Sequence, residues 1–101
     1  MRAAESFAAT VAELDRGGRV SEAVAALSDA VGFFTPVEAA VAYVTLEGGR
    51  RGQLADSLGR MYVRERPGRT VIQMALELHD RGMPAEANAI LRLAVEIGAP
   101  E

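Results

Sequence analysis

The chain has 101 residues, of which 50% are apolar, 5% are aromatic and none is cysteine, and its formal net charge is −3. This length predicts one small domain, 1–101, and the apolar fraction excludes a disordered chain. Without cysteine the chain has no disulfide, no thiolate metal site and no cysteine nucleophile, which is typical of a reducing, cytoplasmic setting.

The first two predicted helices form a hairpin over residues 3–32. Apolar residues recur with the i, i+4, i+7 spacing of one helix face. We expect the first helix to end at Gly18, Ser21 to cap the second helix, and that helix to stop near Gly32. The apolar positions are Phe7, Val11, Leu14, Val24, Leu27 and Val31.

The second predicted hairpin spans residues 35–67. Thr35 and Glu38 have the spacing of a capping box, and Pro36 suits the first helical position. We expect Gly49 to end this third helix and a proline–glycine pair to end the fourth. The predicted buried positions are Val37, Val41, Val44, Leu54, Leu58 and Met61.

The third predicted hairpin spans residues 70–98. Thr70 and Gln73 repeat the capping-box spacing, Gly82 is predicted to end the fifth helix, and Pro84 suits the first turn of the sixth. No sustained two-residue alternation occurs, so we expect no strands. The predicted inward positions are Val71, Met74, Ala75, Leu78, Ala87, Leu91, Ala94 and Ile97.

One sequence pattern occurs twice in the chain. Residues 14–27 read LDRGGRVSEAVAAL and residues 78–91 read LHDRGMPAEANAIL, and a weaker middle copy follows Gly49. The glycines at 18, 49 and 82 recur every 31 to 33 residues, and we expect each to permit a left-handed turn between two helices. This period predicts a stacked array of three helical hairpins.

The repeated positions resemble tetratricopeptide and pentatricopeptide repeats. The shared features are glycine at 18, 49 and 82, alanine at 23 and 87, a large apolar residue at 27, 58 and 91, and alanine at 30 and 94. The resemblance implies an all-α fold, a short α-solenoid of three antiparallel hairpins, with a groove that binds protein segments. A six-helix death-fold-like bundle is the alternative architecture, although such a bundle has no reason to reuse one hairpin pattern.

We do not expect an enzyme, a cofactor or a metal site. His79 is the single histidine, and no serine lies in a nucleophile motif. No paired histidines, calcium loop or phosphate-binding loop is present. No apolar run is long enough to cross a membrane, and no signal peptide is evident.

The basic residues are concentrated in one segment. Residues 50–69 contain six Arg and two acidic residues, Asp56 and Glu65, a net charge of +4, whereas the rest of the chain carries a net charge of −7. The six are Arg50, Arg51, Arg60, Arg64, Arg66 and Arg69. They predict a surface for an acidic protein, for a second copy joined head to tail, or for nucleic acid without base preference. Nucleic acid is the weaker alternative, since only Tyr62 could stack nearby. The resemblance to pentatricopeptide repeats places Ala9 and Ala40 where that class reads bases, and alanine cannot read a base edge.

We therefore predict a non-catalytic protein-interaction module, an adaptor or scaffold in a bacterial regulatory or signalling protein. Its partner would be another protein or a second copy, and the chain could be one piece of a longer protein. The candidate groove residues are polar or charged positions on the predicted first helices, away from the buried stripe. They are Glu13, Glu38, Tyr43, Gln73 and Glu77. Phe33 and Phe34 are predicted to pack between the first two hairpins, with docking of a partner as the alternative.

Overall fold

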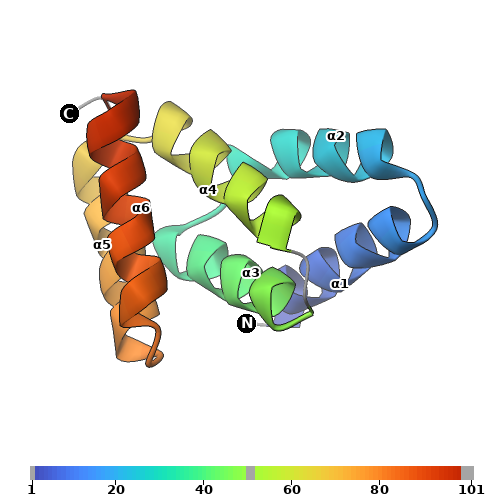
Figure 1. The fold of residues 1–101 in the computed structure, drawn as a ribbon, viewed down its shortest axis with the longest axis horizontal. Helices are drawn as coiled ribbons and strands as arrows, with labels where there is room; N and C mark the ends of the chain where they lie inside the picture. The colour runs from blue at the N-terminus through green and yellow to red at the C-terminus, as the bar shows by residue number, and fades with distance from the viewer. Residues whose placement is uncertain (1, 50–51, 99–101) are drawn as a thin grey trace.

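The computed structural model describes residues 2–49 and 52–98, and these residues form six helices and no strand (Figure 1). The helices are α1 (Arg2–Arg16), α2 (Val20–Val31), α3 (Pro36–Gly48), α4 (Gly52–Glu65), α5 (Gly68–Asp80) and α6 (Pro84–Ile97). The predicted all-α class with six helices is confirmed.

The helices pack in sequential pairs, α1 with α2, α3 with α4, and α5 with α6. Across these pairs, α3 lies between α1 and α5, and α4 lies between α2 and α6, so the odd and even helices form two rows (Figure 1). The first pair has no extensive contact with the third in the described chain. The result is an elongated body of 36 × 25 × 20 Å, with the α1–α2 and α5–α6 pairs at its two ends.

Helix α3 is the centre of the core. It contacts α1, α4 and α5, and its middle is apolar on every side. Its buried residues are Ala39, Ala40, Val41, Ala42, Tyr43 and Leu46. The prediction of a single valine stripe was wrong for Val37 and Val44, which are only partly buried. A helix with neighbours on three sides buries more than one face, and small alanines allow those neighbours to approach closely.

The start of α3 is fixed by the predicted capping box. The Thr35 backbone N–H donates to a Glu38 carboxylate oxygen at 2.9 Å, and the Glu38 N–H donates to the Thr35 hydroxyl at 3.2 Å. The other two predicted caps, Ser21 and Thr70, were wrong. Both residues lie inside the helices, because α2 begins directly after the turn at Arg19 and α5 begins directly after the extended Pro67.

The turns after α1 and α5 have the same geometry. Gly18 and Gly82 have φ of 80° and 78°, as predicted for left-handed glycines. The N–H of the next residue closes each turn, from Arg19 to the Leu14 carbonyl at 2.8 Å and from Met83 to the Leu78 carbonyl at 2.9 Å. Gly49 differs from the prediction, because its φ is −85° and its N–H continues the helical bond pattern to Thr45 at 3.0 Å.

Two inward faces differ from those predicted. On α4, Leu54 and Leu58 are buried as expected, but Met61 is only partly buried, and the next two residues, 62 and 63, lie in the core instead. On α6, Ile90 is buried, whereas Leu91 is 37% exposed. The sequence pattern identifies an apolar stripe, but the positions of neighbouring helices decide which of its edges is covered.

Candidate interaction surfaces

The predicted arginine surface divides into residues with different roles. Arg50 and Arg51 lie outside the described residues. Arg60 donates from Nε to the Asp56 carboxylate at 3.0 Å, and this hydrogen bond raises the pKa of the guanidinium. Arg64 and Arg69 are exposed. Within the described residues, Arg64 and Arg69 therefore lie on the surface without an ion pair, whereas Arg60 is paired with an acid of its own helix.

Arg66 has a structural position within the fold. Its Nη2 donates to the Gly32 carbonyl at 2.6 Å, at the end of α2, and its guanidinium lies 5.3 Å from the ring centroid of Tyr62. A cation at a helix C-terminus satisfies carbonyls that have no partner inside the helix. The sequence prediction of Arg66 as an interaction residue missed this role, because its acceptors come from a segment more than thirty residues earlier.

The predicted aromatic residues are also separated. Phe34 packs edge-on against Phe7 of α1, with ring centroids 5.6 Å apart, which confirms its predicted place between the first two hairpins. Phe33 points to solvent with 85% of its surface exposed. Tyr43 lies in the core and is only 6% exposed, so it does not form part of an interaction surface.

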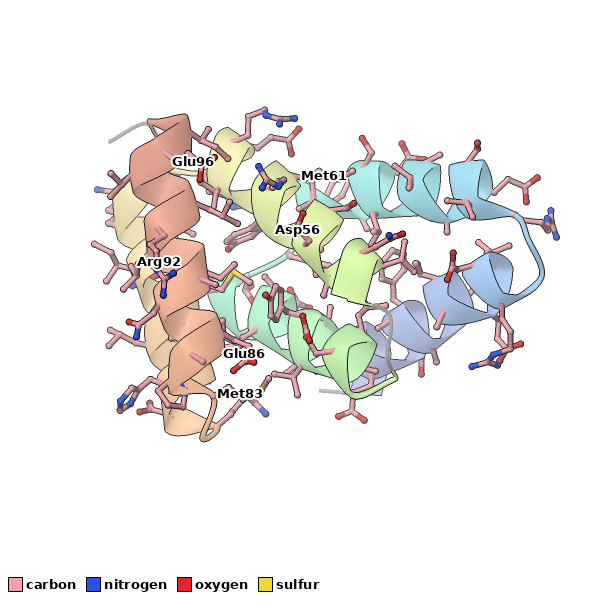
Figure 2. All side chains as sticks on the ribbon, viewed as in Figure 1. Asp56, Met61, Met83, Glu86, Arg92 and Glu96 are labelled. Carbon is pink, nitrogen blue, oxygen red and sulfur yellow. The ribbon has the colours of Figure 1, made fainter. Side chains whose placement is uncertain are left out.

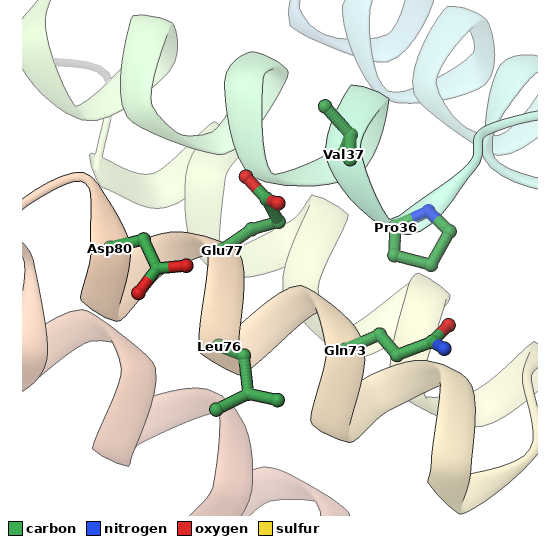
Figure 3. Close-up of a pocket in the computed structure, with 6 residues that line it drawn as sticks. All are labelled: Pro36, Val37, Gln73, Leu76, Glu77 and Asp80. Atoms are coloured by element: carbon green, nitrogen blue, oxygen red, sulfur yellow. The ribbon is translucent and has the colours of Figure 1, made fainter.

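A groove lies between the start of α3 and the middle and end of α5 (Figure 3). Its volume is about 440 Å³, within the range of sites that hold small ligands or one or two side chains. The lining residues are Pro36, Val37, Gln73, Leu76, Glu77 and Asp80. The predicted groove residues Gln73 and Glu77 are therefore at the site. The other four lining residues were not identified from the sequence as site residues.

The groove combines an apolar wall with acidic groups. Pro36 and Val37 form the α3 side, and the Glu77 carboxylate reaches toward them from α5 in Figure 3. Glu77 also lies 3.7 Å from the Nε of Arg81, in a partly exposed ion pair, and Asp80 stands one turn along at the end of α5. The arrangement can accept an apolar side chain next to a cationic group.

A second hollow lies on the outer face of α5 and α6, the side turned away from α3 and α4. It is a shallow apolar depression of about 120 Å³, with Ile72, Leu76 and Leu91 among its lining residues. The one signal in the sequence is that Ile72 and Leu76 lie one helical turn apart and outside the buried stripe of α5.

Acidic residues line the side of the molecule where α4 and α6 meet. Asp56 of α4 and Glu86 and Glu96 of α6 are found there, together with Arg92 (Figure 2). Burial raises the pKa of Tyr43 to about 12, and the negative charges of Glu47, Glu86 and Asp56 add to this effect.

No group of three or more acidic or histidine side chains in residues 2–49 and 52–98 is placed to hold a metal ion, and His79 is exposed at the end of α5. None of the six helices is long and apolar enough to span a bilayer. Comparisons with protein-family models, with curated proteins and with solved structures found no match to this chain.

Proposed function

We propose that this chain is a non-catalytic protein-interaction module that binds a segment of another protein in the groove between α3 and α5. The single observation that carries the proposal is the composition of that groove, in which Pro36, Val37 and Leu76 lie beside Glu77 and Asp80. A recognition site of this kind holds an apolar anchor and fixes its orientation with a few charged groups.

The chemistry of the groove indicates the class of segment. Two carboxylates and the Gln73 amide offer acceptors at its rim, and none of the six described residues that line it is basic. We therefore propose a segment that carries a large apolar side chain flanked by Lys or Arg. Rows of first helices in stacked hairpins form such grooves in helical-repeat proteins. The resemblance to tetratricopeptide repeats supports the same function.

The charge pattern of the sequence raised nucleic acid as an alternative partner, and the positions of the arginines in the structure support it less. Arg66 donates hydrogen bonds to carbonyls at the end of α2, and Arg60 is paired with Asp56, so neither guanidinium is free to bind a phosphate. No aromatic residue that could stack on bases lies between the exposed residues Arg64 and Arg69 in the sequence. A small set of solvated arginines on a chain of net charge −3 does not favour a phosphate backbone as partner.

The test is selection of displayed random peptides of about twelve residues on the wild-type chain, followed by calorimetry of the enriched sequences. We expect peptides with Leu or Phe next to Lys or Arg, and at least tenfold weaker binding by the Glu77→Lys variant. Glu22→Lys on α2 is the matched control, because Glu22, like Glu77, is a glutamate paired with an arginine that adjoins the end of its helix. Enriched peptides that bind Glu77→Lys as well as wild type would refute the groove as the site.

A further inference from the structure

The outer face of the α5–α6 pair carries most of the exposed large apolar side chains of the described chain. Six such residues are exposed in residues 2–49 and 52–98, and four of them are on these two helices. They are Ile72, Leu76, Leu91 and Val95, which are 52%, 59%, 37% and 85% exposed. Figure 1 shows that this pair ends the row of helices, with α3 and α4 on its other side only.

The equivalent positions on α1 and α2 are buried by neighbouring helices. The turns at Gly18 and Gly82 have the same pattern of backbone hydrogen bonds at an offset of 64 residues, so positions on α1 and α2 have equivalents on α5 and α6. The equivalent pairs are Ala8 with Ile72, Leu27 with Leu91, and Val31 with Val95. Ala8, Leu27 and Val31 are at most 1% exposed, where α3 and α4 pack against α1 and α2. The exposed face of α5 and α6 therefore has the positions that a neighbouring helical pair covers.

The opposite end of the molecule is polar at the corresponding places. Thr10 on α1 and Asp29 on α2 are exposed, and their equivalents Met74 and Leu93 are 0% and 9% exposed against the middle pair. A terminal unit with a polar outer side closes a helical stack. The α1–α2 end is closed in this way, whereas the α5–α6 end is not. A second copy joined head to tail would set this apolar face against polar residues.

We infer that two copies of this chain associate through their α5–α6 faces, around a two-fold axis. The inference rests on the proposed function as an interaction module and names a second copy as a partner at the neighbouring α5–α6 face, which shares Leu76 and Asp80 with the groove. In such an isologous contact each apolar residue meets the same face of the other copy. The apolar surface is thereby covered on both copies at once, and the assembly stops at two.

The charges beside the face suit this arrangement. Arg69 at the start of α5 and Asp80 at its end lie on the same side of the helix as Ile72 and Leu76, and both are exposed. A two-fold axis across α5 sets the two copies of this helix antiparallel. Arg69 of each copy then lies near Asp80 of the second copy, and their opposite charges attract.

The experiment is sedimentation equilibrium of the whole chain over a concentration series, from micromolar to near millimolar. We expect a reversible monomer–dimer equilibrium with no larger species. Val95→Glu places a charge in the covered face and should weaken the dimer at least tenfold. Phe33→Glu is the matched control, because Phe33 is also 85% exposed but lies in the α2–α3 connection, and it should leave the dimer unchanged. Circular dichroism verifies that both variants fold.

Charge-reversal variants distinguish a two-fold dimer from head-to-tail association. Asp80→Arg should weaken the dimer, and the double variant Asp80→Arg with Arg69→Asp should restore it, because both halves of the pair occur in each copy. Arg60→Glu with Arg64→Glu should have no effect, whereas loss of association in that variant would support head-to-tail charge pairing instead. A monomer at every concentration, growth beyond two copies, or a dimer indifferent to Val95→Glu overturns the inference. Peptide binding in the groove by Val95→Glu, measured separately, shows that failure of the dimer is not failure of the module.

Discussion

The Nη2 atom of Arg66, at the end of α4, lies 2.8 Å from the backbone carbonyl oxygen of Phe34, in the connection between α2 and α3. One guanidinium thus joins the end of the second helix, the following connection and the fourth helix. The same side chain stacks on Tyr62, whose hydroxyl is 3.5 Å from that carbonyl. Arg66 therefore stabilises the junction between the first two helical pairs.

Replacing Arg66 tests that role. Arg66→Ala leaves the carbonyls of Gly32 and Phe34 without this donor, and we expect a loss of about 2 kcal/mol in the free energy of unfolding. Arg64→Ala is the control, since Arg64 is exposed two residues earlier, and its effect should stay within about 0.5 kcal/mol. Urea unfolding followed by circular dichroism measures both. Equal effects of the two variants would contradict a structural role for Arg66.

The capping box at the start of α3 gives a second expectation. Thr35→Ala removes the acceptor for the Glu38 N–H and should destabilise the fold by about 1 kcal/mol. Ser21 lies inside α2 and makes no cap hydrogen bond, so Ser21→Ala should be neutral or slightly stabilising. Thermal unfolding of the two variants compares a cap that forms with one that only the sequence predicted. A destabilised Ser21→Ala would show that α2 begins later than described.

Gly59 is expected to tolerate no side chain beyond a small one. A Cβ at Gly59, on α4, would lie 2.9 Å from the Cδ1 of Ile90 on α6 and 3.5 Å from the Tyr43 ring. Gly59→Val should therefore cost about 1–3 kcal/mol through overpacking. Gly52→Val, in the same helix, is the control because nothing lies within 4 Å of a Cβ there. Denaturant midpoints of the two variants decide the comparison, and similar midpoints would mean that α4 and α6 are not in close contact.

Stability should fall at high pH because of Tyr43. Its pKa is raised from 10.0 to about 12 in the fold, so the folded chain retains a proton that the unfolded chain releases above pH 10. The contribution of the neutral tyrosine is present in full below pH 10 and is lost as the pH rises toward 12. Tyr43→Phe removes the ionisable group and should flatten this decline relative to wild type. Unfolding free energies at a series of pH values measure it, and parallel declines in the two proteins would show that Tyr43 is not the cause.

Much of the local structure of this protein could be predicted from its sequence. Helical spacing identified six helices, Thr35 and Glu38 identified the start of α3, and Gly18 and Gly82 identified the left-handed turns. These features depend on backbone geometry and on hydrogen bonds between residues a few positions apart. Such interactions are formed by the segment itself, and for that reason they can be read from it.

Which side chains form surfaces could not be predicted from the sequence, because it depends on the packing of the helices. Leu27 and Leu91 occupy equivalent sequence positions, yet Leu27 is buried and Leu91 is 37% exposed, because α4 lies beside α2 and no described helix lies beside the outer face of α6. Arg66 was indistinguishable in sequence from Arg64, and only the return of α4 to the end of α2 gave it partners. Burial and pairing depend on neighbours that are distant in sequence, so no local pattern contains them.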